Sequence, residues 1–478
     1  MNNDPGAATA VPTMAGRPRR SGGLELALAA AAFIVLCVAA LTVTSQLVEP
    51  DDYAYRASIV AVTDGHFLTL SAGQVRALAA QLTRSAGPSR AVLTGSGPLG
   101  GSIEQWAHLP DRRWISEKNP GYPFLAAPFQ ALGIIRLAPL FYGALGCLGL
   151  FAGGRRWLGR FGGAAAVALF CSSGAAVLFA WRDYMPTFTE AALIAAGSGA
   201  LLWTLLAEEA STRRRTAAGL AGFLAIEAAV FVRYTDIVVL GCALGAVLTT
   251  RWRRPASVPR GALWWWAGSV TLCGAGIAAF DDAAYGGPLI SGYRPGEITF
   301  SPGAIPANLR LMPGHLIQAM PMLVLGVAAA AWIIVRRARL TRAGGDDGHL
   351  ARRDCAVAAA LSGSWLGSWG LYATYTWTTQ PGLSTLQTAR FYVPAIGDIA
   401  LLGAWLLVRA PQAGAAHRLL LTATASAVTV ALAGLGLWSF HGMLPGGRPG
   451  SPPPLNCNIG QPHCDAKPPG RGKPHDRR

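Results

Sequence analysis

The sequence predicts an all-α, polytopic integral membrane protein that crosses the bilayer about eleven times. Of its 478 residues, 52% are hydrophobic and only 13% are charged, whereas roughly 25% of the residues in a soluble domain are charged. The mean hydropathy is +0.36. Apolar runs of about 20 residues, the length that a helix needs to cross a bilayer, recur along the chain. This composition excludes an ordinary soluble enzyme and an intrinsically disordered chain.

Eleven apolar segments are the predicted spans. The first follows Arg17, Arg19 and Arg20 and has no small-residue cleavage site after it, so we expect it to remain as an anchor. The fifth and sixth are separated only by Arg233. The predicted spans cover residues 24–47, 132–152, 163–181, 187–207, 216–232, 234–250, 262–280, 315–335, 355–373, 392–409 and 419–438.

Arginine falls mainly in every second segment between these spans, and this sets the expected orientation. With the N-terminus in the cytoplasm, the inner segments hold 21 arginines. The short outer loops then hold only Arg182, Arg233, Arg294, Arg310 and Arg390. Cytoplasmic loops are usually the ones rich in Lys and Arg, so we expect a cytoplasmic N-terminus and an outer C-terminus. The formal net charge of +16 then follows from topology, and nucleic acid is not expected as a partner.

The same topology divides the chain into three parts. Residues 1–22 form a cytoplasmic tail, and residues 23–438 form one multi-helix domain with a long outer loop at 48–131. Residues 439–478 form a basic, Pro/Gly-rich outer tail that we expect to be disordered. Two hypotheses stand for the cysteines of this tail: a disulfide between Cys457 and Cys464, or a zinc site that includes His463.

Polar residues capable of chemistry collect on the expected outer side. Ionisable groups in or beside membrane helices are costly, so their placement carries information about function. The inner loops contain Arg without a comparable mixture of acids and aromatics. The outer set comprises residues 49–53 (EPDDY), 117–123 (EKNPGYP), 181–186 (WRDYMP) with Glu190, 233–236 (RYTD), Asp281 and Asp282, 285–288 (YGGP), Tyr293 and Arg294, and 390–392 (RFY).

Such a set suits glycosyl transfer from a lipid-linked phosphate sugar. A carboxylate at the mouth of a helix bundle can act as a general base towards an acceptor hydroxyl or amine. Arg and Lys side chains can bind a phosphate and stabilise the charge on it as it leaves. Aromatic side chains at the interface can stack on sugar rings. The bilayer itself would present the phosphate of a lipid at this depth.

These stretches resemble motifs of the GT-C superfamily of polyprenyl-phosphate-sugar-dependent glycosyltransferases, which includes protein O-mannosyltransferases and lipid A aminoarabinose transferases. In that superfamily an acidic pair and an aromatic residue open the outer loop after the first span, as residues 49–55 (EPDDYAY) do here. A Lys-Pro-Pro-like stretch leads into the second span, written here as 117–123. Residues 285–293 (YGGPLISGY) and 389–395 (ARFYVPA) are similar to later motifs. The likeness covers about 45–410, in order.

The resemblance implies a role for each matching residue. Asp51 or Asp52 would be the catalytic base, and Lys118 and Arg390 would contact the donor phosphate. Arg182 and Asp183 would help to shape the acceptor or metal site. The substrate-binding set is completed by Glu117 and Tyr293. The resemblance leaves undecided whether the enzyme needs a divalent metal ion, because metal use varies in the superfamily. Asp51-Asp52 lacks the Asp-x-Asp spacing of the metal-dependent members, and no metal ligand is assigned.

Simpler interpretations stand beside these. Asp51 and Asp52 could cap the helix of the outer loop, because Asp satisfies free backbone N–H groups there. Glu117 and Lys118 could form a solvated surface pair. Arg182 and Asp183 could form a local ion pair, which contributes roughly 0–1 kcal/mol when exposed. Arg233 and Asp236 could be partners that lower each other's desolvation cost. For Asp281 and Asp282 two interpretations stand: they line a lipid-sugar pocket, or they lie in water.

The sequence therefore predicts a membrane glycosyltransferase that moves a sugar from a polyprenyl-phosphate donor to an envelope lipid, glycan or protein at the outer face of a bacterial inner membrane. The expected partners are the polyprenyl-phosphate sugar and, by preference, a lipid or glycan acceptor. The main alternative is a transporter or flippase for a lipid-linked sugar or a related anion. Transporters usually show repeated halves and charges near the midplane, whereas no repeat is visible here. A structural membrane subunit is the third hypothesis.

Overall fold

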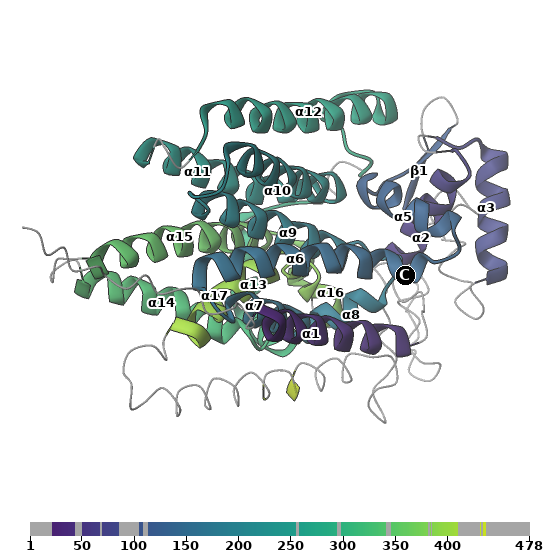
Figure 1. Ribbon diagram of the computed structural model, residues 1–478. Helices are drawn as coiled ribbons and strands as arrows, with labels where there is room; N and C mark the ends of the chain where they lie inside the picture. The colour runs from purple at the N-terminus through teal and green to yellow at the C-terminus, as the bar shows by residue number, and fades with distance from the viewer. Residues whose placement is uncertain are drawn as a thin grey trace, which may run out of the picture.

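The computed structural model describes residues 22–43, 50–66, 69–85, 105–108, 113–254, 258–293, 298–340, 346–380, 383, 385–409, 431 and 434–435. Within these residues the chain is all-α apart from one two-stranded antiparallel sheet. Long helices lie side by side in a bundle, and short helices and the sheet gather at one end of it (Figure 1). The fold class predicted from the sequence is confirmed.

Six helical segments among the described residues are long and apolar enough to cross a membrane, and eight are if each of two bent pairs counts as one span. The long helices of the bundle are α1 (Gly22–Thr42), α6 (Ala138–Leu158), α9 (Thr187–Leu206), α10 (Thr212–Val232), α11 (Ile237–Arg253), α12 (Arg260–Tyr285), α14 (Leu323–Leu340) and α15 (Asp346–Ala373). Every predicted span up to 392–409 has a helical counterpart. The last, 419–438, lies almost entirely outside the described residues, as does the predicted tail at 439–478.

The helices differ in how far the rest of the bundle covers them. In α9, 67% of the most apolar window is buried, against 22% in α1 and 11% in α12. Accordingly, α9 lies inside the bundle, whereas α1 and α12 lie at opposite edges of it (Figure 1). A helix that is apolar but little covered by protein suits a lipid-facing position. The centre of the bundle is therefore built on α9, with α17 (Ile396–Arg409) also deeply buried.

Glycines bring α6 and α9 close together. A Cβ atom on Gly149 would lie 2.6 Å from the carbonyl oxygen of Ala196, and one on Gly153 would lie 2.6 Å from that of Gly199. Any side chain at these positions would overlap with the neighbouring backbone. Small residues four apart are a common means of close helix packing in lipid, where van der Waals contact replaces the hydrophobic effect as the driving force.

Two predicted spans are not straight, which corrects the sequence interpretation. Residues 163–181 form α7 (Gly162–Cys171) and α8 (Gly174–Trp181), which meet at 62°. Residues 315–335 run from α13 (Ile305–Ala319) into α14, and these meet at 108°. The second break contains Pro321, which lacks an N–H group and disfavours helical geometry in the residue before it. Apolar length alone does not reveal such bends.

The end of the bundle that carries short elements comes mainly from the long loop predicted at 48–131. It contains α2 (Pro50–Thr63), α3 (Ala72–Ser85), β1 (Trp106–His108), β2 (Trp114–Ser116) and α5 (Gly121–Ala131). Trp106 pairs with Ser116 across the two strands, and Leu70 bridges to Trp114 on the other side. The sheet thus holds the residues that follow β2, at 117–118, against the end of the bundle.

The remaining short elements connect helices near that same region or within the bundle. They are the 3-10 helices η2 (Ile135–Leu137), η3 (Tyr234–Asp236), η5 (Pro302–Ala304), η6 (Trp377–Thr379) and η7 (Val393–Ala395), and the short helix α16 (Thr385–Ala389). The segment from η6 to η7 replaces part of the predicted span at 392–409, so α17 itself has only 14 residues. Arg390 lies in the segment between α16 and η7, outside the helices, as its place before the predicted span indicated.

Candidate functional site

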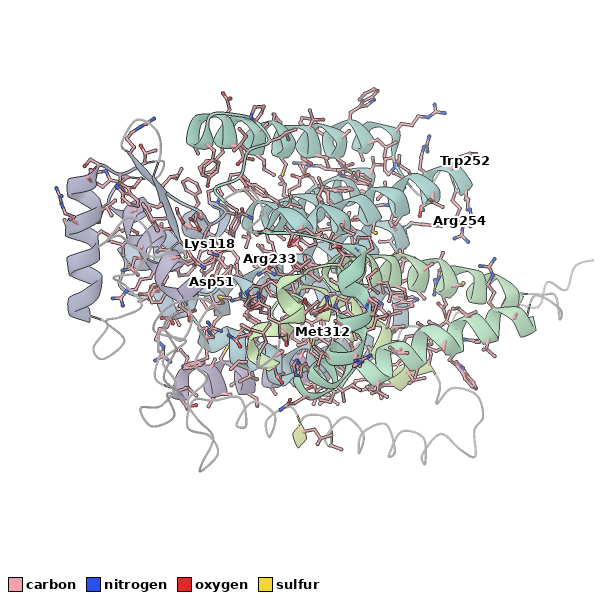
Figure 2. The ribbon with its side chains drawn as sticks, turned by 180° about the vertical axis from the view of Figure 1, so that it is seen from behind. Asp51, Lys118, Arg233, Trp252, Arg254 and Met312 are labelled. Atoms are coloured by element: carbon pink, nitrogen blue, oxygen red, sulfur yellow. The ribbon has the colours of Figure 1, made fainter. Side chains whose placement is uncertain are left out.

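Residues from four distant segments meet at the end of the bundle that carries α2 and α5. Asp51, Lys118 and Arg233 lie near one another there, whereas Trp252 and Arg254 lie at the opposite end (Figure 2). These three members of the predicted outer set thus lie at one end of the fold, away from the arginines of α11, whereas Glu49 and Arg294 of the same set lie outside the described residues.

Asp51 is held between two cations. Its Oδ1 atom lies 2.9 Å from Lys118 Nζ, and its Oδ2 atom lies 2.8 Å from Arg390 Nη1. Asp51 stands in the first turn of α2, where a carboxylate also interacts favourably with the helix dipole. The three side chains are largely buried but not closed off, with exposures of 14% for Asp51, 7% for Lys118 and 10% for Arg390. Together they carry one net positive charge.

The two cations dominate the electrostatics of Asp51. Burial raises the pKa of its carboxyl, but the Lys118 ammonium and the Arg390 guanidinium outweigh burial and hold that pKa well below its ordinary value. For Lys118, burial lowers the pKa of the ammonium, but Asp51 outweighs it and the pKa is raised. Both groups are therefore ionised at neutral pH, and Asp51 is a weak base while both cations bind it.

Lys118 is fixed by the loop that follows α12. Its Nζ atom donates a hydrogen bond to the Tyr293 hydroxyl at 3.2 Å and lies 5.1 Å from the centre of the Tyr293 ring. The hydroxyl of Tyr285 donates to the Ser116 carbonyl at 3.0 Å. A Cβ atom on Gly292 would lie 2.7 Å from the Cα atom of Glu117, so only glycine allows this approach. The stretches 117–123 and 285–293, which the sequence analysis singled out separately, are therefore in direct contact.

Arg390 lies against aromatic rings. Its guanidinium carbon is 4.8 Å from the ring centre of Phe391 and 5.2 Å from that of Trp377. Stacking of this kind orients a guanidinium and contributes about 0.5–2 kcal/mol. Trp377 was missed in the sequence analysis because it belongs to no charged motif. The one available signal was its place in an aromatic stretch at 372–377 between two predicted spans.

A second ion pair extends the cluster towards the centre of the bundle. Arg233 Nη2 lies 3.2 Å from Oε2 of Glu190, whose side chain is fully buried in α9. Arg233 Nη1 also donates to the carbonyl oxygen of Arg390 at 3.5 Å. The sequence left open a pair between Arg233 and Asp236; the structure gives Arg233 an ion pair with Glu190, and Arg233 also interacts electrostatically with Asp236. Arg233 therefore links α9 to the backbone that carries Arg390.

Asp52 points the other way and is closed off. Its Oδ2 atom lies 2.6 Å from Arg182 Nη2, and the two side chains are 2% and 0% exposed. Arg182 directly follows α8, the second helix of the bent pair α7–α8, so this ion pair joins α8 to α2. The sequence left open a local pair between Arg182 and Asp183 and gave no sign of the ion pair between Arg182 and Asp52. The neighbouring Asp183 is buried, and its carbonyl accepts a hydrogen bond from the Tyr122 hydroxyl.

Glu117 is buried as well. It is 6% exposed, and its N–H donates to the Gln105 carbonyl at 2.9 Å. With Lys118 also buried, the interpretation of Glu117 and Lys118 as a solvated surface pair is wrong, because the small sheet and the 285–293 loop cover both. Asp281 is buried too, and its Oδ1 accepts a hydrogen bond from Tyr234 at 2.9 Å, whereas Asp282 is exposed.

Of the predicted site residues, Asp51, Lys118, Tyr293 and Arg390 are linked in one network, and Glu117 adjoins it. Arg182 joins Asp52 in a separate buried pair. Within the part of the chain that the structure describes, no group of three or more His, Cys, Asp and Glu side chains is placed to share a metal ion. The network offers a carboxylate beside two cations, an arrangement suited to a ligand with an anionic group and a transferable proton nearby.

Comparison with known proteins gives a limited likeness. No family model matches the sequence, and the search of curated proteins gave no match. Similar solved structures include ArnT from Cupriavidus metallidurans in the apo state, with a TM-score of 0.46 and 16% identity, and ArnT from the same organism bound to undecaprenyl phosphate, with a TM-score of 0.45 and 15% identity. Each comparison covers 82% of this chain and 60% of the other. The chain thus spans less than two thirds of the ArnT chain.

Proposed function

We propose that this protein is a membrane glycosyltransferase that takes a sugar from a polyprenyl-phosphate donor and transfers it to an acceptor at the membrane surface. The observation that carries the proposal is the position of Asp51 between Lys118 and Arg390. A general base and two phosphate-binding cations are the groups that this reaction needs side by side. They lie at the end of apolar helices, where the phosphate of a membrane lipid would be found.

The net positive charge of this network favours an anionic ligand. When a donor phosphate enters, it competes with Asp51 for Lys118 and Arg390, because both cations can form charge-assisted hydrogen bonds with phosphate oxygens. Any cation that turns from Asp51 to the phosphate stops lowering the pKa of Asp51. Donor binding would thereby convert a weak base into a stronger one, so that the base becomes active only in the loaded enzyme.

In the transfer step, an acceptor O–H or N–H attacks the anomeric carbon of the sugar, and the bond from that carbon to the phosphate oxygen breaks. The electron pair of the broken bond leaves with the phosphate, whose charge Lys118 and Arg390 stabilise. Asp51 takes the acceptor proton. Inversion at the anomeric carbon is what the GT-C resemblance implies.

Asp51 and Asp52 receive different roles in this proposal. Asp51 is the base, because its side chain is accessible and part of the cation network. Asp52 is a positioning residue, because its buried pair with Arg182 fixes the first turn of α2 and hence the direction of Asp51. Tyr293 holds Lys118 through its hydroxyl. Glu117 and Asp183 shape the backbone around the site.

The location follows from the arginine distribution. We propose that the site faces outward from a bacterial inner membrane, with the N-terminus at 1–22 in the cytoplasm and the tail at 439–478 outside. The multi-helix domain at 23–438 is then the transferase. Apart from 48–131, the outer loops predicted from the sequence are short, which favours a lipid or glycan acceptor over a folded protein.

The test compares envelope lipids and glycans by mass spectrometry in a deletion strain that carries wild-type protein, Asp51→Asn, or Asp64→Asn at equal abundance. Asp64 is an exposed carboxylate one residue after α2, so it matches the charge change without touching the network. We expect one sugar to be lost on deletion, restored by wild type and Asp64→Asn, and not restored by Asp51→Asn. Full restoration by Asp51→Asn would overturn the assignment of the base.

A second measurement separates transferase from transporter. Purified protein is incubated with a synthetic polyprenyl-phosphate sugar and an extract of deletion-strain lipids, and release of polyprenyl phosphate is measured. A transferase frees polyprenyl phosphate as the product appears, whereas a flippase binds the donor and leaves its glycosidic bond intact. If both the wild type and Asp51→Asn bind the donor without releasing polyprenyl phosphate, the result would favour the transporter.

A further inference from the structure

A cavity lies in the half of the bundle away from the candidate site. It has a volume of about 680 Å³ and is lined mainly by apolar side chains of α9, α10, α11 and α15. Its lining also includes Ser198, Ser364 and Asp398, which are well inside the helices. Four arginines line the other end: Arg253, Arg254, Arg337 and Arg353. The cavity is therefore apolar along its walls and strongly cationic at one end.

The length of the cavity matches one leaflet of a bilayer. Ser364 and Arg353 lie on the same helix, α15, 11 positions apart, which corresponds to about 16 Å at 1.5 Å per residue. This is roughly half of the 30 Å hydrocarbon thickness. The cavity thus reaches from the middle of the bundle to the end that carries the arginines, the depth that a single acyl chain occupies.

The arginine end also lies at the height expected for lipid headgroups. Trp252, next to Arg253, is 88% exposed, and it lies with Arg254 at the end of the bundle opposite Asp51 (Figure 2). Exposed Trp residues at helix ends are typical of the membrane–water interface. Arg253 and Arg254 are themselves exposed. An anion bound by these arginines would therefore lie in the plane of the headgroups.

Charge fixes both the type and the direction of the ligand. Asp398, at the inner end of the cavity, would repel a negative group there, whereas the four arginines attract one at the mouth. Basic pockets between membrane helices bind the headgroups of anionic lipids. We infer that this cavity binds an anionic phospholipid, with its phosphate among Arg253, Arg254, Arg337 and Arg353 and one acyl chain between α11 and α15. This site is separate from the proposed transferase site and does not depend on that proposal.

The test is a lipid titration of the purified full-length protein by native mass spectrometry. Phosphatidylglycerol and phosphatidylcholine with the same acyl chains are compared for wild type, Arg253→Gln/Arg337→Gln and the control Arg213→Gln/Arg214→Gln. Arg213 and Arg214 are exposed arginines in the first turn of α10 and do not line the cavity. We expect phosphatidylglycerol to bind wild type and the control alike. The cavity variant should bind it about 25-fold more weakly, at about fivefold for each of the two arginines.

A second variant tests the acyl chain and does not rely on charge. Ala246 lines the cavity on α11, and Ala246→Phe would fill part of it. We expect this variant to lose phosphatidylglycerol binding while keeping all four arginines. Unchanged binding by Ala246→Phe, equal loss in the Arg213/Arg214 control, or equal binding of phosphatidylcholine would each overturn the proposal. Inorganic phosphate is tested by thermal unfolding, and stabilisation of wild type equal to that by phosphatidylglycerol would indicate an ion site instead.

Discussion

Arg182 and Asp52 form an ion pair in which Nη2 and Oδ2 are 2.6 Å apart and both side chains are almost completely buried. The residues are 130 positions apart in the sequence. They connect the end of the bent helix α8 to the first turn of α2, the turn that carries Asp51. The orientation of the proposed base thus depends on a contact that lies outside the cation network.

The first prediction concerns this pair. Asp52→Asn removes the carboxylate that lies 2.6 Å from the buried Arg182 guanidinium, and breaking a buried pair in this way costs about 3–5 kcal/mol. We expect a clearly lower Tm for Asp52→Asn, measured by thermal unfolding in detergent, and little change for the exposed control Asp64→Asn. Asp51→Asn should lower the Tm less, because water can reach the cations it leaves behind. An Asp52→Asn protein as stable as wild type would show that the pair does not hold α2.

The second prediction concerns the dependence of stability on pH. The pKa of Asp51 is lower in the folded protein than the value of about 3.9 expected in the unfolded chain. Its contribution to the free energy of unfolding is therefore fully present above about pH 4 and is lost as the pH falls through the folded-state value. We expect the difference in Tm between wild type and Asp51→Asn to stay constant from about pH 8 to about pH 5. A difference that shrinks steadily over this interval would contradict the assigned direction of the shift.

The third prediction concerns the two cations. Lys118→Gln removes one charge-assisted contact with the phosphate, which contributes about 1.5–3 kcal/mol, so kcat/KM should fall roughly 10- to 150-fold. The same change removes a cation that lowers the pKa of Asp51, so the acid limb of the rate profile should move to higher pH. A purely structural Lys118 would leave that limb in place. The measurement is transfer from a synthetic donor as a function of pH.

The fourth prediction separates guanidinium geometry from charge at Arg390. Arg390→Lys keeps the positive charge but loses the planar contact with Trp377 and Phe391. Arg and Lys are not interchangeable at stacked or bidentate positions. We expect a higher KM for the donor with a Tm close to that of wild type. Equal KM values for the two proteins would show that position 390 contributes charge alone.

The fifth prediction concerns the packing of α6 on α9. A methyl group at Gly153 would lie 2.6 Å from the Gly199 carbonyl oxygen, so Gly153→Ala forces the helices apart. Overpacking of this kind typically costs about 1–3 kcal/mol. Gly268→Ala in α12 is the matched control, because no atom lies within 4 Å of its Cβ position. We expect a lower Tm only for Gly153→Ala; similar values for both variants would mean that the helix contact is looser.

The proposed site was only partly accessible to sequence reasoning. The polar stretches and their common side could be predicted, because charged residues beside apolar spans are rare and easily recognised. The ion pairs that reach across the fold could not be predicted: nothing in the sequence indicated that Arg233 pairs with Glu190 or that Arg182 pairs with Asp52. Trp377 carries no charge and belongs to no motif, so nothing in the sequence connected it with Arg390.

The sequence by itself determined that this is a helical membrane protein and where helices lie up to residue 409, because the length and hydropathy of an apolar segment are local properties of the chain. It also determined which residues are candidates for chemistry. Only the tertiary structure decided that Asp51 and not Asp52 faces the two cations, and that two predicted spans bend. The Asp51–Arg390 contact joins residues 339 positions apart, and no local pattern encodes the direction in which one helix turn points when distant helices pack against it.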